Sequence, residues 1–166
     1  VIRKKGFVND TTPGSPICRW TYKGETVDIM PDDKSVLGFT NQWYKPAFAH
    51  RVEVELSDGT LIFIFPALYY IATKIEAIRG RGGDDLRFSH DFEDLIYVLN
   101  NCEEIVDMFD AEKNEDLTSY LSIWANEMLA RQNGQEEIEC ALPYGDYERF
   151  DHIFKIISHF AKGHRQ

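Results

Sequence analysis

The sequence predicts an α+β fold with strands in its first part and helices in its second. Up to residue 66, apolar and polar residues alternate in short runs that turn residues separate, which is the pattern of β-hairpins. From Pro66 onward the apolar residues recur every three or four positions, which is the period of amphipathic helices. We therefore divide the chain into a β-rich part, residues 1–66, and a helical part, residues 67–166.

A first hairpin is expected near the beginning of the chain. Apolar and polar residues alternate over 17–22, the turn Lys23-Gly24 follows, and a second run covers 26–30. Pro31 and the aspartates after it end the second strand, because these residues favour turns. Residues 32–50 then form a long connection that carries several aromatic side chains.

A second hairpin is expected to complete the β-rich part. Residues 51–56 alternate between apolar and acidic side chains, so this strand should have one solvated face. The sequence Ser57-Asp58-Gly59-Thr60 is a strong turn signal. Residues 61–65 are apolar on both faces, and we therefore expect them to form a buried strand.

Helices are expected from Pro66 to the end of the chain. The first runs through residue 79 and ends at the sequence Gly80-Arg81-Gly82-Gly83. Ser89 should cap the next helix, because acidic residues follow it in the first turn, where the helix dipole favours negative charge. Three further helices are expected over roughly 102–110, 113–131 and 146–162.

Charge and cysteine content disfavour several classes of protein. The net charge of −10 disfavours broad, non-specific binding of nucleic acid, although four basic residues cluster between positions 74 and 87. The longest apolar run, residues 61–65, is too short to cross a bilayer. The three cysteines are widely spaced and match no zinc or disulfide pattern, so we expect reduced, mostly buried thiols in a cytoplasmic protein.

Asp28 is the first candidate for chemistry. It interrupts an apolar strand, and an acid in such a strand is costly to bury unless it is paired or binds a metal ion. Strand alternation places its side chain on the face opposite Val27 and Ile29. The simpler interpretation is that Asp28 lies on the solvated face of a hairpin, and for a single acid that interpretation is the stronger one.

A second set of candidates lies on two consecutive helices. Lys74 is near the apolar edge of its helix, from which a long side chain can reach a phosphate. Asp91 and Asp94 share a helix face and should have a cationic partner, for which Arg79 and Arg81 are the natural candidates. The alternative for Lys74 and the arginines is a solvated stripe of charge, which the spacing by itself favours, and the alternative for the aspartates is capping at the start of a helix.

Taken together, several segments of the sequence resemble one protein family. They are Cys18-Arg19-Trp20, Val27-Asp28-Ile29-Met30-Pro31, Leu37-Gly38-Phe39-Thr40-Asn41-Gln42-Trp43-Tyr44, Ala72-Thr73-Lys74-Ile75-Glu76-Ala77, Arg79-Gly80-Arg81, Asp84 and Ser89-His90-Asp91-Phe92-Glu93-Asp94-Leu95-Ile96. Over about residues 1–160 the chain thereby resembles the AbiEii/AbiGii-type nucleotidyltransferases of the DNA polymerase β-like superfamily. The lysine-bearing helix, the arginine after it and the paired-aspartate helix carry the most specific part of the resemblance.

The resemblance implies a nucleotidyltransferase-like mixed β-sheet followed by a C-terminal helical bundle. It also implies that a nucleoside triphosphate binds with Mg²⁺ and that its nucleotidyl group is transferred to a hydroxyl of RNA, protein or a small molecule. Some members of the family act as toxins of toxin–antitoxin systems, so an antitoxin is among the partners that the resemblance implies.

The resemblance also assigns a role to each candidate residue. It implies Asp28 as the catalytic metal ligand and base, Lys74 with Arg79 or Arg81 as the residues that bind the nucleotide, and Asp91 and Asp94 as residues that support the site. By the family pattern, a Gly-Gly or Gly-Ser motif and an Asp-x-Asp pair precede the point where this sequence begins, and no Asp-x-Asp pair occurs within it.

The sequence begins as though a helix were ending. Residues 1–7 are typical of the basic last turn of a helix, a glycine stop and the start of another element, so we expect further residues before Val1. Because one carboxylate does not hold two metal ions, this chain by itself should be inactive or nearly so. Two alternatives stay open: an inactive module of the same fold that binds a nucleotide, RNA or a protein, and an acidic partner of a basic protein.

Overall fold

The computed structural model describes residues 2–38, 40–81, 84–143 and 147–163, which form an α+β protein, as predicted. The chain divides into two compact units, Val1–Asn41 and Gln42–Gln166. The predicted division at residue 66 followed the change from strands to helices, whereas the compact units divide after Asn41. The predicted breaker residues Gly82 and Gly83 lie outside the described residues.

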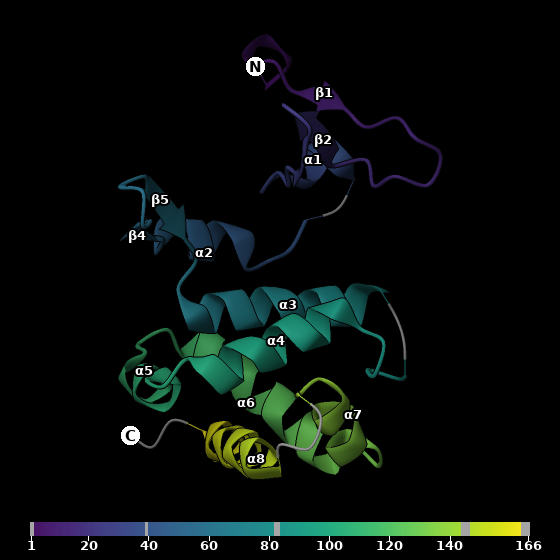
Figure 1. Ribbon diagram of the computed structural model, residues 1–166. Helices are drawn as coiled ribbons and strands as arrows, with labels where there is room; N and C mark the ends of the chain where they lie inside the picture. Colours follow the sequence, from purple (N-terminus) through teal and green to yellow (C-terminus); the bar gives the residue numbers. More distant parts are fainter. Residues whose placement is uncertain (1, 39, 82–83, 144–146, 164–166) are drawn as a thin grey trace. The chain divides into compact units, whose positions relative to one another are not determined.

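The first unit is built on a three-stranded antiparallel sheet of order β1-β2-β3 (Figure 1). Its elements are η1 Ile2–Lys5, β1 Val8–Asn9, β2 Arg19–Tyr22, β3 Glu25–Asp28 and α1 Lys34–Leu37. The predicted hairpin turn is confirmed, because φ is 51° at Lys23 and 89° at Gly24, the positive angles that a two-residue turn of this kind requires.

The second unit contains the helix α2, one hairpin and the helices that follow the hairpin (Figure 1). Its elements are α2 Tyr44–Ala49, β4 Val52–Glu55, β5 Leu61–Ile64, α3 Ala67–Arg81, α4 His90–Asn101, α5 Ile105–Ala111, α6 Glu115–Ala130, α7 Gly134–Cys140 and α8 Tyr147–Ala161. The helices expected after residue 66 are confirmed, but α7 was not predicted. Only Ile138 supplies a buried apolar side chain within α7, so the helix has no apolar period to detect.

The second hairpin forms as predicted, but its last strand is not buried. β4 and β5 pair antiparallel from Val52 opposite Ile64 to Glu55 opposite Leu61, and Gly59 adopts a φ of 82° in the turn. The expectation of a buried strand is wrong, because Leu61 and Phe63 are both more than half exposed. An apolar run shows that its residues can be buried, but their burial depends on whether other elements pack against them.

The core of the second unit lies between its helices. α3 packs on α4 and α6, and α8 packs on α6 and α4 (Figure 1). Apolar side chains from each of these helices are fully buried. The described strands form two separate antiparallel sheets, and a mixed sheet of the expected kind is not among them. None of the described helices is both long and apolar enough to span a membrane.

The three cysteines are free thiols in different surroundings. Cys18 is buried, Cys102 is half-buried and Cys140 is exposed. The expectation of reduced thiols agrees with the structure, whereas the expectation that most of them are buried holds fully only for Cys18.

Candidate functional site

The α3–α4 pair carries most of the candidate residues. Lys74 and Arg81 are seven positions apart on α3, which is close to two helical turns, so they project from the same side of the helix. Arg79 projects from a different side of α3, because five positions correspond to about one and a half turns. The helix therefore separates one predicted nucleotide-binding residue from the other two.

The beginning of α4 supplies the carboxylates. Ser89 caps this helix, as predicted, with its hydroxyl oxygen accepting a hydrogen bond from the backbone N–H of Phe92 at 3.3 Å. The cap fixes the first turn, in which the side chain of Asp91 is only 9% exposed while that of Asp94 is half exposed. One buried and one accessible carboxylate thus lie within a single turn of α4.

These four side chains form one ionic network, here called the α3–α4 charge cluster: Lys74, Arg81, Asp91 and Asp94. The ammonium of Lys74 donates to Oδ1 of Asp91 at 3.2 Å and to Oδ2 of Asp94 at 2.5 Å. The guanidinium of Arg81 donates to the other carboxylate oxygen of Asp91. Asp91 is therefore shared by two cations, and both of its oxygens are satisfied.

Lys74 stays charged within the cluster. Burial disfavours its ammonium form, but the hydrogen bond to Asp94 and the charges of Asp94 and Asp91 hold the pKa of Lys74 above its usual value. The ring of Tyr70, one helical turn earlier, lies 5.4 Å from the ammonium and adds a cation–π contact. Lys74 is thus a fixed positive charge that only partly faces solvent.

The predicted partnership of the aspartates with arginine is correct for Arg81 and wrong for Arg79. Arg79 donates to Glu127 of α6 at 2.7 Å, and its guanidinium lies 4.9 Å from the ring centre of Tyr120. It belongs to the contact between α3 and α6. The main partner of the aspartates is Lys74, which was predicted to reach a phosphate from the apolar edge of its helix but was not connected to them.

Asp28 lies in the other compact unit, at the end of β3. Its carboxylate accepts two hydrogen bonds from the guanidinium of Arg19 on the neighbouring strand, both at 2.9 Å. These bonds hold the pKa of Asp28 below its usual value, and the side chain is 42% exposed. A carboxylate in this state accepts a proton poorly, so the geometry gives Asp28 the role of a cross-strand ion-pair partner.

A second ionic network escaped the sequence analysis. Glu137 of α7 is almost completely buried and accepts hydrogen bonds from the guanidinium of Arg131 and from the backbone N–H of Leu86. Arg131 also donates to the backbone carbonyl of Asp84 at 2.5 Å. This network attaches the segment before α4 to α7. The available signal was a glutamate followed by an apolar residue in a helix without apolar period, which is too weak to single out Glu137.

The described residues do not fit the Mg²⁺ ion that the family resemblance implies. Within the described ranges, no three carboxylate, histidine or cysteine side chains gather as a ligand set. Asp28 is bound to Arg19, and Asp91 shares both oxygens with cations, so neither presents free oxygens to a metal.

Comparison of the chain with protein-family models, curated proteins and solved structures finds no significant match. The geometry of the α3–α4 charge cluster is therefore the basis on which a function is inferred.

Proposed function

We propose that the α3–α4 charge cluster binds the triphosphate of a nucleoside triphosphate, as part of a nucleotidyltransferase-like protein. The observation that carries the proposal is that one buried carboxylate, that of Asp91, holds Lys74 and Arg81 together. The four charges of the cluster cancel, and an anion that displaces Asp94 from Lys74 meets one net positive charge on Lys74, Arg81 and Asp91. Because Asp91 fixes both cations in advance, an anion that binds them need not order them.

Asp94 is the group that a phosphate would replace. It holds Lys74 from the accessible side of the cluster, and its carboxylate regains hydration easily because it is half exposed. A triphosphate carries more charge than one carboxylate, so it competes well for the same ammonium. Lys74 suits a phosphate as a point charge, and the exposed guanidinium of Arg81 suits it in a bidentate manner.

Transfer of a nucleotidyl group to a hydroxyl of RNA, protein or a small molecule rests on the family resemblance. The described residues supply cations for the nucleotide but no metal ligand set, so we extend the proposal to transfer only where further carboxylates complete such a set. A cytoplasmic, non-catalytic module that binds the same nucleotide shares the binding step. Nucleotide binding is accordingly the property to test first.

Titration of the protein with a fluorescent ATP analogue tests the proposal. We expect Lys74→Met and Arg81→Ala each to weaken binding by about tenfold or more, because each removes a charge-assisted hydrogen bond. Asp94→Asn should strengthen binding, because it releases Lys74 from its competing carboxylate. Arg79→Ala is the matched control, since it removes the same charge from the same helix on a side that faces Glu127.

The titration is made once with EDTA and once with added Mg²⁺, so that a contribution of the metal is measured separately. Equal losses of nucleotide affinity in Arg79→Ala and Lys74→Met would show that only the overall charge of the protein affects binding, and would contradict a specific site at the cluster. Weaker binding in Asp94→Asn would contradict the replacement of Asp94 by a phosphate.

A further inference from the structure

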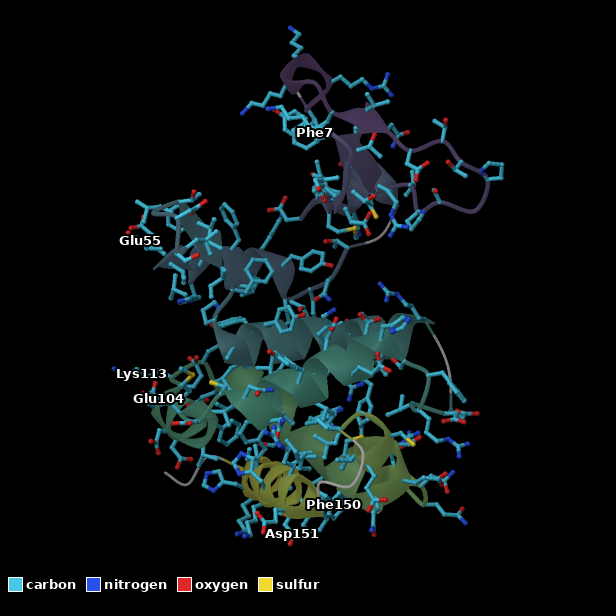
Figure 2. The ribbon with its side chains drawn as sticks, in the orientation of Figure 1. Phe7, Glu55, Glu104, Lys113, Phe150 and Asp151 are labelled. Atoms are coloured by element: carbon cyan, nitrogen blue, oxygen red, sulfur yellow. The ribbon has the colours of Figure 1, made fainter. Side chains whose placement is uncertain are left out.

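The hairpin β4–β5 leaves large apolar side chains in solvent. Leu61 and Phe63 are 57% and 58% exposed, and Val52, Leu56 and Ile64 are between 43% and 45% exposed. Figure 2 shows the side chains of this hairpin, with Glu55 labelled. A two-stranded hairpin gains little stability from itself, and exposed apolar groups concentrated on one element indicate a surface that binds something.

One edge of the hairpin has backbone groups directed outward. The backbone N–H of Leu56 donates to the carbonyl of Thr60 at 2.8 Å beside the turn, and hydrogen-bonded pairs alternate along an antiparallel ladder. Ile62 and Ile64 therefore direct their backbone groups toward β4, and Leu61 and Phe63 direct theirs away from it. Among the described strands, none pairs with β5 on that outer side.

The two edges of the hairpin differ in charge. β4 carries Glu53 and Glu55, and charged side chains protect an edge strand against pairing with another chain. β5 consists of the residues Leu-Ile-Phe-Ile and has no such protection. The edge that is open to pairing is therefore that of β5.

A groove continues this edge. It has a volume of about 560 Å³ and lies at the end of β5, between the hairpin and the helices α3 and α4. Its lining is formed by the side chains of Phe63, Ile64, Phe65, Ala67, Tyr70 and Val98. A chain that pairs with β5 thus finds an apolar pocket for its side chains next to the backbone groups that it binds.

The charges of the hairpin indicate what kind of chain fits. Strand alternation places Glu53 and Glu55 on one face with Leu61 and Phe63, and the opposite face is entirely apolar. Asp58 in the turn adds a third acid, whereas the single cation, Arg51, lies over the ring of Phe63 at 5.0 Å. A strand that complements both faces has basic residues on one side and apolar residues on the other.

We propose that the outer edge of β5 binds an extended segment of a partner protein, in which basic and apolar residues alternate, as an added third strand. The backbone of the segment pairs with Leu61 and Phe63, its apolar side chains cover the apolar face and the groove, and its basic side chains extend across Leu61 and Phe63 toward the acidic side chains of β4. The proposal does not rest on nucleotide binding by the α3–α4 charge cluster, although Tyr70 both lines the groove and contacts Lys74.

The test uses a short capped peptide that alternates lysine with valine. Binding is followed by fluorescence anisotropy, and amide hydrogen exchange is measured residue by residue on the whole chain. We expect the amides of Leu61 and Phe63 to exchange at least about tenfold more slowly when the peptide is bound, because they acquire hydrogen-bond partners. The same peptide with glutamate in place of lysine should bind at least about tenfold more weakly.

Two variants block the edge without removing a bond of the hairpin. Phe63→Pro deletes an N–H that faces outward, a position at which an edge strand tolerates proline, and Leu61→Lys adds a charge that repels a basic strand. Each should weaken binding of the lysine peptide about tenfold or more. Phe154→Ala, which alters a similarly exposed aromatic residue on α8, should leave it unchanged.

Continued protection of the Ile62 and Ile64 amides verifies that the hairpin is intact in both variants. Unchanged binding in both edge variants, or equal binding of the glutamate peptide, would overturn the proposal. Without peptide, the amides of Leu61 and Phe63 could also exchange slowly and become more protected as the protein concentration rises. That result would overturn the proposal, because a second copy of the chain would then occupy the edge.

Discussion

Asp91 and Asp28 are both candidate carboxylates that bind arginine, and they differ in what surrounds them. Asp91 lies at the packed start of α4, is 9% exposed and holds two cations from another helix. Asp28 lies on a thin sheet, is 42% exposed and holds the one arginine opposite it. An aspartate–arginine pair therefore belongs to a partly buried ionic network in one compact unit and to an exposed cross-strand ion pair in the other. The difference matters because burial decides how strongly each charge depends on its partners.

Glu137 is a third carboxylate that binds arginine, and it is almost completely buried. Its substitution should therefore cause the largest loss in the free energy of unfolding. Glu137→Gln leaves Arg131 without its anionic partner and weakens the bond to Leu86, so we expect the free energy of unfolding to fall by about 3 kcal/mol. Urea denaturation at neutral pH measures the loss. Glu136→Gln is the matched control, because its neighbouring carboxylate is more than half exposed and should matter little.

The same residue gives stability a dependence on pH. The hydrogen bonds from Arg131 hold the pKa of Glu137 below its usual value of 4.5, so its stabilising charge is fully present above that pH. The contribution is lost as the pH falls through the lower pKa of the folded protein. Between neutral pH and acid the stability of Glu137→Gln should therefore fall less than that of the unaltered chain. Parallel curves would show that the charge of Glu137 is not coupled to folding.

Asp91→Asn should have an intermediate effect. The change removes the charge that Lys74 and Arg81 share, but Lys74 keeps Asp94 and the exposed Arg81 regains water. We expect a loss of about 1–2 kcal/mol in the free energy of unfolding, measured by urea denaturation. Glu93→Gln removes the same charge from the same helical turn at a more exposed position, so it separates the helix-dipole contribution from that of the cluster. Equal losses in the two variants would mean that the cluster itself adds nothing.

Features that neighbouring residues encode could be predicted from the sequence. The hairpin turns at Lys23-Gly24 and Gly59 require positive φ angles that few residues adopt, and the cap at Ser89 needs only the residues that follow it. The helical periods of α3, α4, α6 and α8 likewise follow from the spacing of apolar residues within each segment. These signals were sufficient for the two hairpins, for the helices α3, α4, α5, α6 and α8 and for the α+β class, but not for α7, nor for α1 and α2 within the expected connection over residues 32–50.

Features that depend on distant residues could not be predicted in the same way. Lys74 and Asp91 are 17 positions apart, so their contact follows from how α3 packs on α4. The seven-residue spacing gives Lys74 and Arg81 a common face of α3, but nothing in that spacing indicates the carboxylate of α4 that they share. The exposure of β5 shows the opposite case, in which an apolar run suggests burial and the fold provides nothing to cover it.

Asp28→Asn should have the smallest effect on stability, several times smaller than that of Asp91→Asn. Its ion pair with Arg19 is open to water, where the attraction is screened and each charge is well hydrated when alone. The comparison is made by urea denaturation of both variants at low and high salt, and the difference between them should persist at high salt, because the partly buried pair is screened less. A loss in Asp28→Asn as large as that in Asp91→Asn would show that Asp28 is buried by an interaction beyond its own sheet. In that case the hypothesis that Asp28 belongs to a catalytic site would gain support, because a carboxylate that is buried away from its strand surface needs a partner other than Arg19.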